Sequence, residues 1–218
     1  MLQDGPLLDP DPADVARVMA DVVRGVGVEG LPWSETASLT RDRLKFMHGV
    51  DPSWPDVSAE ALTDQLDGWL GPRLAGIRRW DELERVDFGA LLLARLPWDR
   101  RATLEQWAPT HIEVPSGSRV AVDYSDPGTP VLAVRLQELF GLTETPTVAG
   151  GRVPLTLHLL SPARRPVQVT RDLAGFWRTT YFEVRKDLKG RYPKHAWPDD
   201  PLRAEPTRHA NRRGSRGT

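Results

Sequence analysis

Basic and aromatic side chains are interleaved near the C-terminal end of the sequence. The cations are Arg171, Arg178, Arg185, Lys186, Lys189, Arg191 and Lys194, and the aromatic residues beside them are Tyr192 and Trp197. Cations neutralise the phosphates of a nucleic-acid strand, and aromatic rings stack on its unpaired bases. The pattern predicts a site for single-stranded RNA or DNA. Two other interpretations stay open: the charges are solvated surface, or Tyr192 and Trp197 clasp the C-terminal segment onto the core.

Other kinds of chemistry have no recognisable motif here. The sequence lacks the phosphate-binding pattern G-x-x-x-x-G-K-[ST], so the chain is predicted not to hydrolyse ATP by itself. The five histidines lack metal-ligand spacing, and there is no cysteine for a zinc site or a disulfide. We therefore assign no catalytic residue, no metal site and no cofactor to this chain.

One amphipathic helix is predicted to carry most of the cations, from about residue 170 to 189. Thr170 is a candidate N-cap, and the apolar stripe consists of Leu173, Phe176, Trp177, Tyr181, Val184 and Leu188. On a continuous helix, Arg171, Arg178, Arg185 and Lys189 would fall within about 40° of one another, because a heptad drifts by only ~20°. Such a helix would pack on the core and present a row of cations to solvent.

The rest of the sequence changes from a helical to an extended pattern. Apolar residues recur at helical spacing up to about residue 108, whereas residues 119–124 and 155–159 alternate as strands do. We predict an α+β fold, in which a helical N-terminal half precedes a small mixed sheet and the amphipathic helix. The expected divisions are a helical region 1–108, an α+β region 109–202, and a disordered basic tail 203–218.

The charges of this 218-residue chain nearly cancel, to a net −1, but they are unevenly distributed. Residues 1–90 carry −8, residues 91–218 carry +7, and residues 161–218 alone carry +8. This asymmetry favours a polyanion partner at the basic end. No apolar run approaches the ~20 residues of a membrane span, and the acidic N-terminus is unlike a signal peptide. We expect a cytoplasmic location and no membrane partner.

Several segments resemble the C-terminal domain of HrpB, a family of bacterial ATP-dependent helicases of the DExH type in superfamily 2. The segments are 159–163 (LLSPA), 165–170 (RPVQVT), 172–177 (DLAGFW), 181–186 (YFEVRK) and 190–195 (GRYPKH), with earlier ones at 31–33 (LPW), 114–118 (VPSGS) and 136–141 (LQELFG). The resemblance runs from about residue 28 to 202 and is densest after residue 109.

The resemblance implies an accessory domain of a helicase whose two RecA-like domains bind ATP and Mg²⁺. Those cofactors belong only to the missing core, and the family's catalytic residues have no counterpart here. We expect the domain to contact single-stranded RNA or DNA and to work with the helicase core in cis or in trans. The alternative function is a protein docking module, which holds the domain on the helicase core or on an outside partner.

Overall fold

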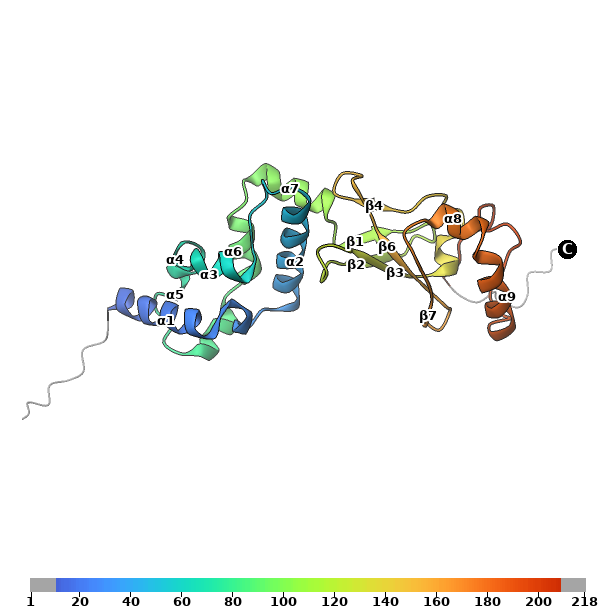
Figure 1. The fold of residues 1–218 in the computed structure, drawn as a ribbon. Helices are drawn as coiled ribbons and strands as arrows, with labels where there is room; N and C mark the ends of the chain where they lie inside the picture. Colours follow the sequence, from blue (N-terminus) through green and yellow to red (C-terminus); the bar gives the residue numbers. More distant parts are fainter. Residues whose placement is uncertain (1–10, 209–218) are drawn as a thin grey trace, which may run out of the picture. The chain divides into compact units, whose positions relative to one another are not determined.

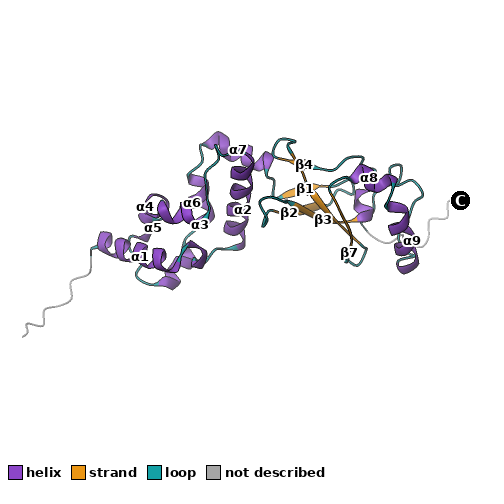
Figure 2. Ribbon diagram, viewed as in Figure 1, coloured by secondary structure: helices purple, strands orange, loops and turns teal. Residues whose placement is uncertain are grey.

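The computed structural model describes residues 11–208, within which the chain divides into two compact units. The boundary falls between Ala102 and Thr103, inside helix α7 (Trp98–Trp107). The first unit is helical, and the strands found in the described residues belong to the second (Figures 1 and 2). Between residues 11 and 208, no helix has the length and apolar content needed to cross a bilayer.

Capping residues set the starts of helices in the first unit. Asp11 accepts a hydrogen bond from the N–H of Ala13 at 2.9 Å, and Pro12 occupies the first helical turn. Ser58 caps its helix in the same way. The elements are α1 (Pro12–Val26), η1 (Val28–Gly30), α2 (Glu35–Val50), α3 (Ala59–Asp64), α4 (Leu66–Trp69), α5 (Gly71–Leu74), η2 (Trp80–Arg85) and α6 (Phe88–Ala94), followed by α7.

The second unit is built on a five-stranded mixed sheet with the strand order β1-β2-β3-β6-β7. Only β3 and β6 run parallel, and the other neighbours are antiparallel. The strands are β1 (His111–Glu113), β2 (Arg119–Asp123), β3 (Val131–Arg135), β6 (Thr156–Leu160) and β7 (Pro166–Thr170). A separate pair joins β4 (Thr147–Val148) to β5 (Val153–Pro154). The predicted α+β class is confirmed.

One face of this sheet is buried and the other is open. In β2, Val122 is buried, whereas Arg119 and Ala121 are exposed. The buried side belongs to a core that includes an aromatic cluster around Trp177, whose ring lies 6.2 Å from Phe140 and 5.3 Å from Tyr181. Phe140 directly follows the short helix η3 (Leu136–Leu139), so the cluster ties the end of β3 to the C-terminal helices.

The predicted helix from 170 to 189 is wrong: the segment forms two helices, α8 (Leu173–Arg178) and α9 (Tyr181–Arg191). Strand β7 extends to Thr170, and Asp172 caps α8 by accepting from the N–H of Gly175. At the break, Thr179 donates its hydroxyl back to the carbonyl of Gly175 at 2.8 Å. Two adjacent β-branched residues with such a competing bond weaken a helix, and packing of the aromatic cluster completes the break.

The expectation of a disordered tail from residue 203 is corrected for its first six residues. The N–H of Thr207 donates to the carbonyl of Gln137 at 3.0 Å, and Nε of Arg208 donates to the carbonyl of Ser116 at 2.8 Å. Thr207 and Arg208 are therefore bound to earlier residues of the second unit, to which they belong. The rest of the expected tail, residues 209–218, lies outside the described residues.

Candidate nucleic-acid interface

Most of the cations predicted from the sequence are exposed on α8, α9 and the loop that follows. Arg191 pairs with Asp187 at 3.1 Å. Within residues 11–208, the other exposed cations of this set have no ion pair; they are Arg171, Arg178, Lys186, Lys189 and Lys194. Because the helix is broken, the predicted single row is wrong: Arg171 precedes α8, Arg178 ends it, and Lys186 and Lys189 lie on α9.

Arg185 and Trp197 fasten the C-terminal segment and are not exposed groups. Nε of Arg185 donates to the carbonyl of Trp197 at 2.9 Å, and its guanidinium pairs with Asp199 at 2.5 Å. The indole of Trp197 is only 8% exposed and donates to the carbonyl of Tyr192 at 2.8 Å. Trp197 therefore holds the C-terminal segment on the core, as in the clasp interpretation that the sequence left open. Its ring has no free face on which a base could stack.

Tyr192 is half-buried. Its ring meets His195 edge-on with centroids 6.3 Å apart, and its hydroxyl lies 3.5 Å from Oγ of Ser161. Burial, with the Arg135 charge, lowers the pKa of His195, so this imidazole adds less positive charge near neutral pH than a free one. Of the aromatic rings on α8 and α9, Phe182 is exposed, at 49%, whereas five cations that are unpaired among the described residues, and also Arg191, are exposed on α8, α9 and the adjoining residues.

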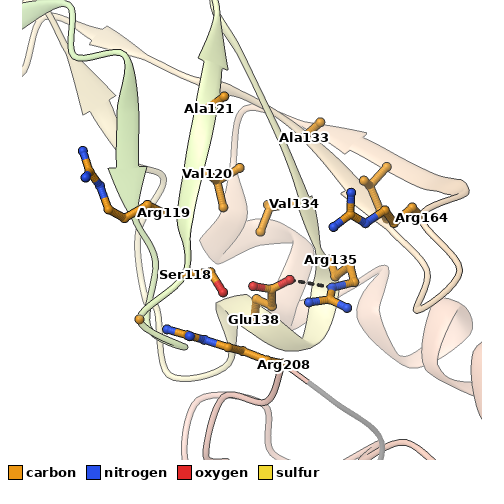
Figure 3. Close-up of a pocket in the computed structure, with 12 residues that line it drawn as sticks. Ser118, Arg119, Val120, Ala121, Ala133, Val134, Arg135, Glu138, Arg164 and Arg208 are labelled. Atoms are coloured by element: carbon orange, nitrogen blue, oxygen red, sulfur yellow. Dashed lines mark hydrogen bonds and ion pairs between the residues drawn. The ribbon is translucent and has the colours of Figure 1, made fainter.

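A cavity of about 600 Å³ on the open side of the sheet was not anticipated from the sequence. Four arginines and one carboxylate line it: Arg119, Arg135, Arg164, Arg208 and Glu138 (Figure 3). They come from the start of β2, the end of β3, the β6–β7 turn, the C-terminal segment and η3. In Figure 3, Arg119 lies at the rim and extends away from Glu138. Successive arginines of this set are 16 to 44 residues apart in sequence, so no local motif reveals them.

Glu138 is the buried acid of the cavity, at 5% exposure. It accepts from Nε of Arg135 at 2.6 Å and from the hydroxyl of Ser116 at 3.1 Å. Burial opposes ionisation, but hydrogen bonds from Ser118, Arg135 and Ser116, with the Arg135 charge, keep the pKa of Glu138 below its usual value. Glu138 is therefore an anion that neutralises Arg135, and the remaining arginines keep their charge.

No group of three or more histidine or acidic side chains suited to a metal occurs within the described part of the chain.

Comparison with protein families identifies this part of the chain. The model described as "ATP-dependent helicase C-terminal" matches residues 69–201, more than half of the sequence. The chain belongs to the HrpB helicase C-terminal family. The match includes the α8–α9 cations and three of the four cavity arginines, and it ends before Arg208.

Relatives of known structure agree with membership in the HrpB family. The chain is 43% identical over 211 residues to the "ATP-dependent RNA helicase HrpB" of Escherichia coli K12, covering 95% of this chain and 26% of that protein. A crystal structure of the E. coli DExH-box NTPase HrpB superposes with a TM-score of 0.86, at 43% identity, over 94% of this chain and 26% of that one. A crystal structure of the E. coli DEAH/RHA helicase HrpB superposes with a TM-score of 0.73, at 40% identity, over 90% of this chain and 25% of that one. The chain thus spans about a quarter of these relatives.

Proposed function

We propose that this chain is an accessory part of an HrpB-type helicase that holds single-stranded nucleic acid by its phosphates and hydrolyses no ATP itself. The observation on which the proposal rests is the surplus of exposed cations around α8 and α9: six of the seven Lys or Arg residues at 171–198 are exposed, and five of these six have no ion pair among the described residues. Membership in the HrpB family supports the proposal, because one relative is described as an RNA helicase that depends on ATP. The absence of ATP-binding motifs assigns hydrolysis to the helicase core.

The side chains favour contacts to the sugar–phosphate backbone over contacts to bases. Trp197 is buried and Tyr192 is half-buried, which leaves Phe182 as the exposed ring of α8 and α9, outnumbered by the exposed cations there. Arg and Lys contacts to phosphates are independent of sequence. We therefore expect binding that tolerates any base sequence and weakens steeply with salt. RNA is the expected natural ligand, in keeping with the name of the E. coli relative.

A salt titration of the whole chain tests the proposal. Binding of a fluorescent single-stranded RNA, and of the matching DNA, is measured at several salt concentrations, in the native chain and in the triple variant Arg171→Gln/Arg178→Gln/Lys189→Gln. Each phosphate contact contributes ~0.7 to the slope of log K against log salt, so losing three contacts lowers the slope by about 2. The matched control replaces three exposed arginines of the first unit, Arg17, Arg73 and Arg79, by glutamine and should leave the slope unchanged.

Failure of the native chain to bind either strand at low salt overturns the proposal. The proposal would also be contradicted if the salt slope fell equally in the α8–α9 variant and in the first-unit control, because net charge alone would then explain binding.

A specific surface supports docking on the helicase core as a second function. Val18, Val22 and Val26 are exposed at four-residue spacing along α1, and a groove of about 450 Å³ beside them includes Ile77. Exposed apolar patches mark protein contacts, and the relatives carry about three quarters of their length outside this match. The replacement Val18→Glu/Val22→Glu should abolish co-purification with a separately expressed helicase core, whereas charge reversal of the α8–α9 cations should not. The opposite result would place docking on the basic region.

A further inference from the structure

The arginine-lined cavity on the open face of the sheet carries more positive charge than its surroundings neutralise. Among the described residues, Glu138 is the one acid that lines it, and Glu138 already bonds to Arg135. Across residues 11–208, no carboxylate lies within 4.0 Å of the guanidinium groups of Arg119, Arg164 or Arg208. Glu113 is opposite Arg119 in the β1–β2 register, but the two form no ion pair at that distance.

Backbone features place Arg164 and Arg208 on the lining of this one cavity. Arg164 lies in the tight turn between β6 and β7 with a φ of 59°, and its N–H donates to the carbonyl of Ser161 at 2.8 Å. Gly117 has a φ of 74°, and a Cβ at that position would lie 2.7 Å from Nη2 of Arg208. The glycine therefore leaves the space that the guanidinium of Arg208 occupies. Like charges gathered in this way repel one another unless an anion is present between them.

The remaining walls indicate which anion fits. Ala121 and Ala133 are exposed on adjacent strands and add only methyl groups to the open face. None of the described residues that line the cavity is aromatic, so these walls offer no platform for a base. Guanidinium groups match the oxygens of phosphate in paired hydrogen bonds. The shape and charge thus suit a phosphate group with its attached sugar.

We propose that this cavity is a phosphate-binding pocket, in which Arg164 and Arg208, with Arg119 at the rim, hold a phosphate of a single-stranded nucleic acid. The inference rests on the proposed function and extends it by assigning a second contact point in the same unit, separate from the α8–α9 cations. The phosphate is either an internal phosphodiester or the monoester at a strand end, and the experiment separates the two.

Inorganic phosphate is the first probe. It is titrated into the ¹⁵N-labelled whole chain while the side-chain Nε–H signals of arginine are followed by NMR. The expected result is a saturable shift of the Arg164 and Arg208 signals. In the variant Arg119→Gln/Arg164→Gln/Arg208→Gln, phosphate should bind at least about tenfold more weakly, since charge-assisted hydrogen bonds are lost. The matched control, Arg171→Gln/Arg178→Gln/Lys189→Gln, should bind phosphate as the native chain does. Far-ultraviolet circular dichroism confirms that both variants fold.

Single-stranded RNA is the second probe, with and without a 5′-phosphate. The pocket variant should lower the salt slope by about 0.7, because its three arginines hold a single phosphate. A preference for the 5′-phosphorylated strand that the pocket variant loses identifies the terminal monoester, and equal affinity identifies the internal diester.

Three results overturn the inference: no saturable phosphate shift in the native chain, undiminished phosphate binding in the pocket variant, or an unchanged RNA salt slope in that variant. In the last case, RNA binding by α8 and α9 still stands, so the proposed function survives. If phosphate binds in the pocket while no strand binds at low salt, the proposed function fails and nucleic acid is overturned as the source of the phosphate.

Discussion

Replacing Trp197 by alanine should destabilise the second unit strongly and should not act on a nucleic-acid contact directly. The indole is 8% exposed. An aromatic side chain buries about 150–250 Å², and at ~25 cal/mol per Å² this corresponds to at most about 4–6 kcal/mol. Measured truncations of buried aromatic residues cost about 3–5 kcal/mol, and we expect this range for Trp197→Ala. The milder variant Trp197→Phe keeps most of the ring but removes the donor to the Tyr192 carbonyl, for about 1–2 kcal/mol.

Native-state hydrogen exchange measures this effect in the correct unit. The amides of Leu157 and Leu159 lie in β6, which is paired on both sides, and report the free energy of unfolding of the second unit. Trp98 provides the control, since it is 82% exposed and Trp98→Ala should change that free energy by less than about 0.5 kcal/mol. RNA binding is measured on Trp197→Phe, which keeps the fold.

Stacking of Trp197 on a base would give the opposite pattern. The free energy of unfolding would then change by less than about 0.5 kcal/mol in Trp197→Ala. Binding of single-stranded RNA to Trp197→Ala, which would then keep its fold, would weaken by about 1–3 kcal/mol, the value of one stacked base. That pair of results would refute the assignment of Trp197 as a structural clasp.

Three further substitutions test the ionic contacts. Arg41 is 4% exposed and donates to both carboxylate oxygens of Glu29, at 2.9 and 2.8 Å, and to a backbone carbonyl. Because lysine lacks the forked guanidinium, Arg41→Lys should lower the free energy of unfolding of the first unit by about 2 kcal/mol. An unchanged thermal midpoint would contradict this. The pKa of Glu138 is lower in the folded chain, so its stabilisation is present above the ordinary value of about 4.3 and is lost as the pH falls through the folded pKa. Urea unfolding between pH 3 and 6 should therefore show a smaller pH dependence in Glu138→Gln, and equal dependence in the two chains would exclude this role. Arg185→Gln loses its bond to the Trp197 carbonyl and its ion pair with the 93%-exposed Asp199, so the free energy of unfolding measured in urea should fall by about 1 kcal/mol. Amides near Trp197 should exchange faster, and unchanged exchange rates there would contradict the role of Arg185 in holding the C-terminal segment.

Sequence was sufficient where the deciding interactions are local. Asp11 with Pro12, and Ser58, cap helices as their positions predict, because a cap involves residues two or three apart. The alternation of polar and apolar residues places β2 and β6, because one face of a strand must be buried. The exposure of Arg178 and Lys189 also follows from their separation from the apolar stripe.

Tertiary packing decided the remaining features. Trp177 and Tyr181 are anchored by hydrogen bonds to the carbonyls of Leu142 and Pro198, so two helices replace the single helix that periodicity predicts. Arg185 belongs by periodicity to the exposed row, yet a carbonyl 12 residues away turns it inward.

The arginine cavity has the same origin on a larger scale. The sheet brings Arg119 and Arg135 to one open face, and the β6–β7 turn and C-terminal segment add Arg164 and Arg208. Local patterns in the sequence therefore determined the element types, the class of fold and the basic character of the C-terminal region. Which cations remain free to meet a phosphate depends on contacts between residues far apart in the chain, and only the folded structure supplies those.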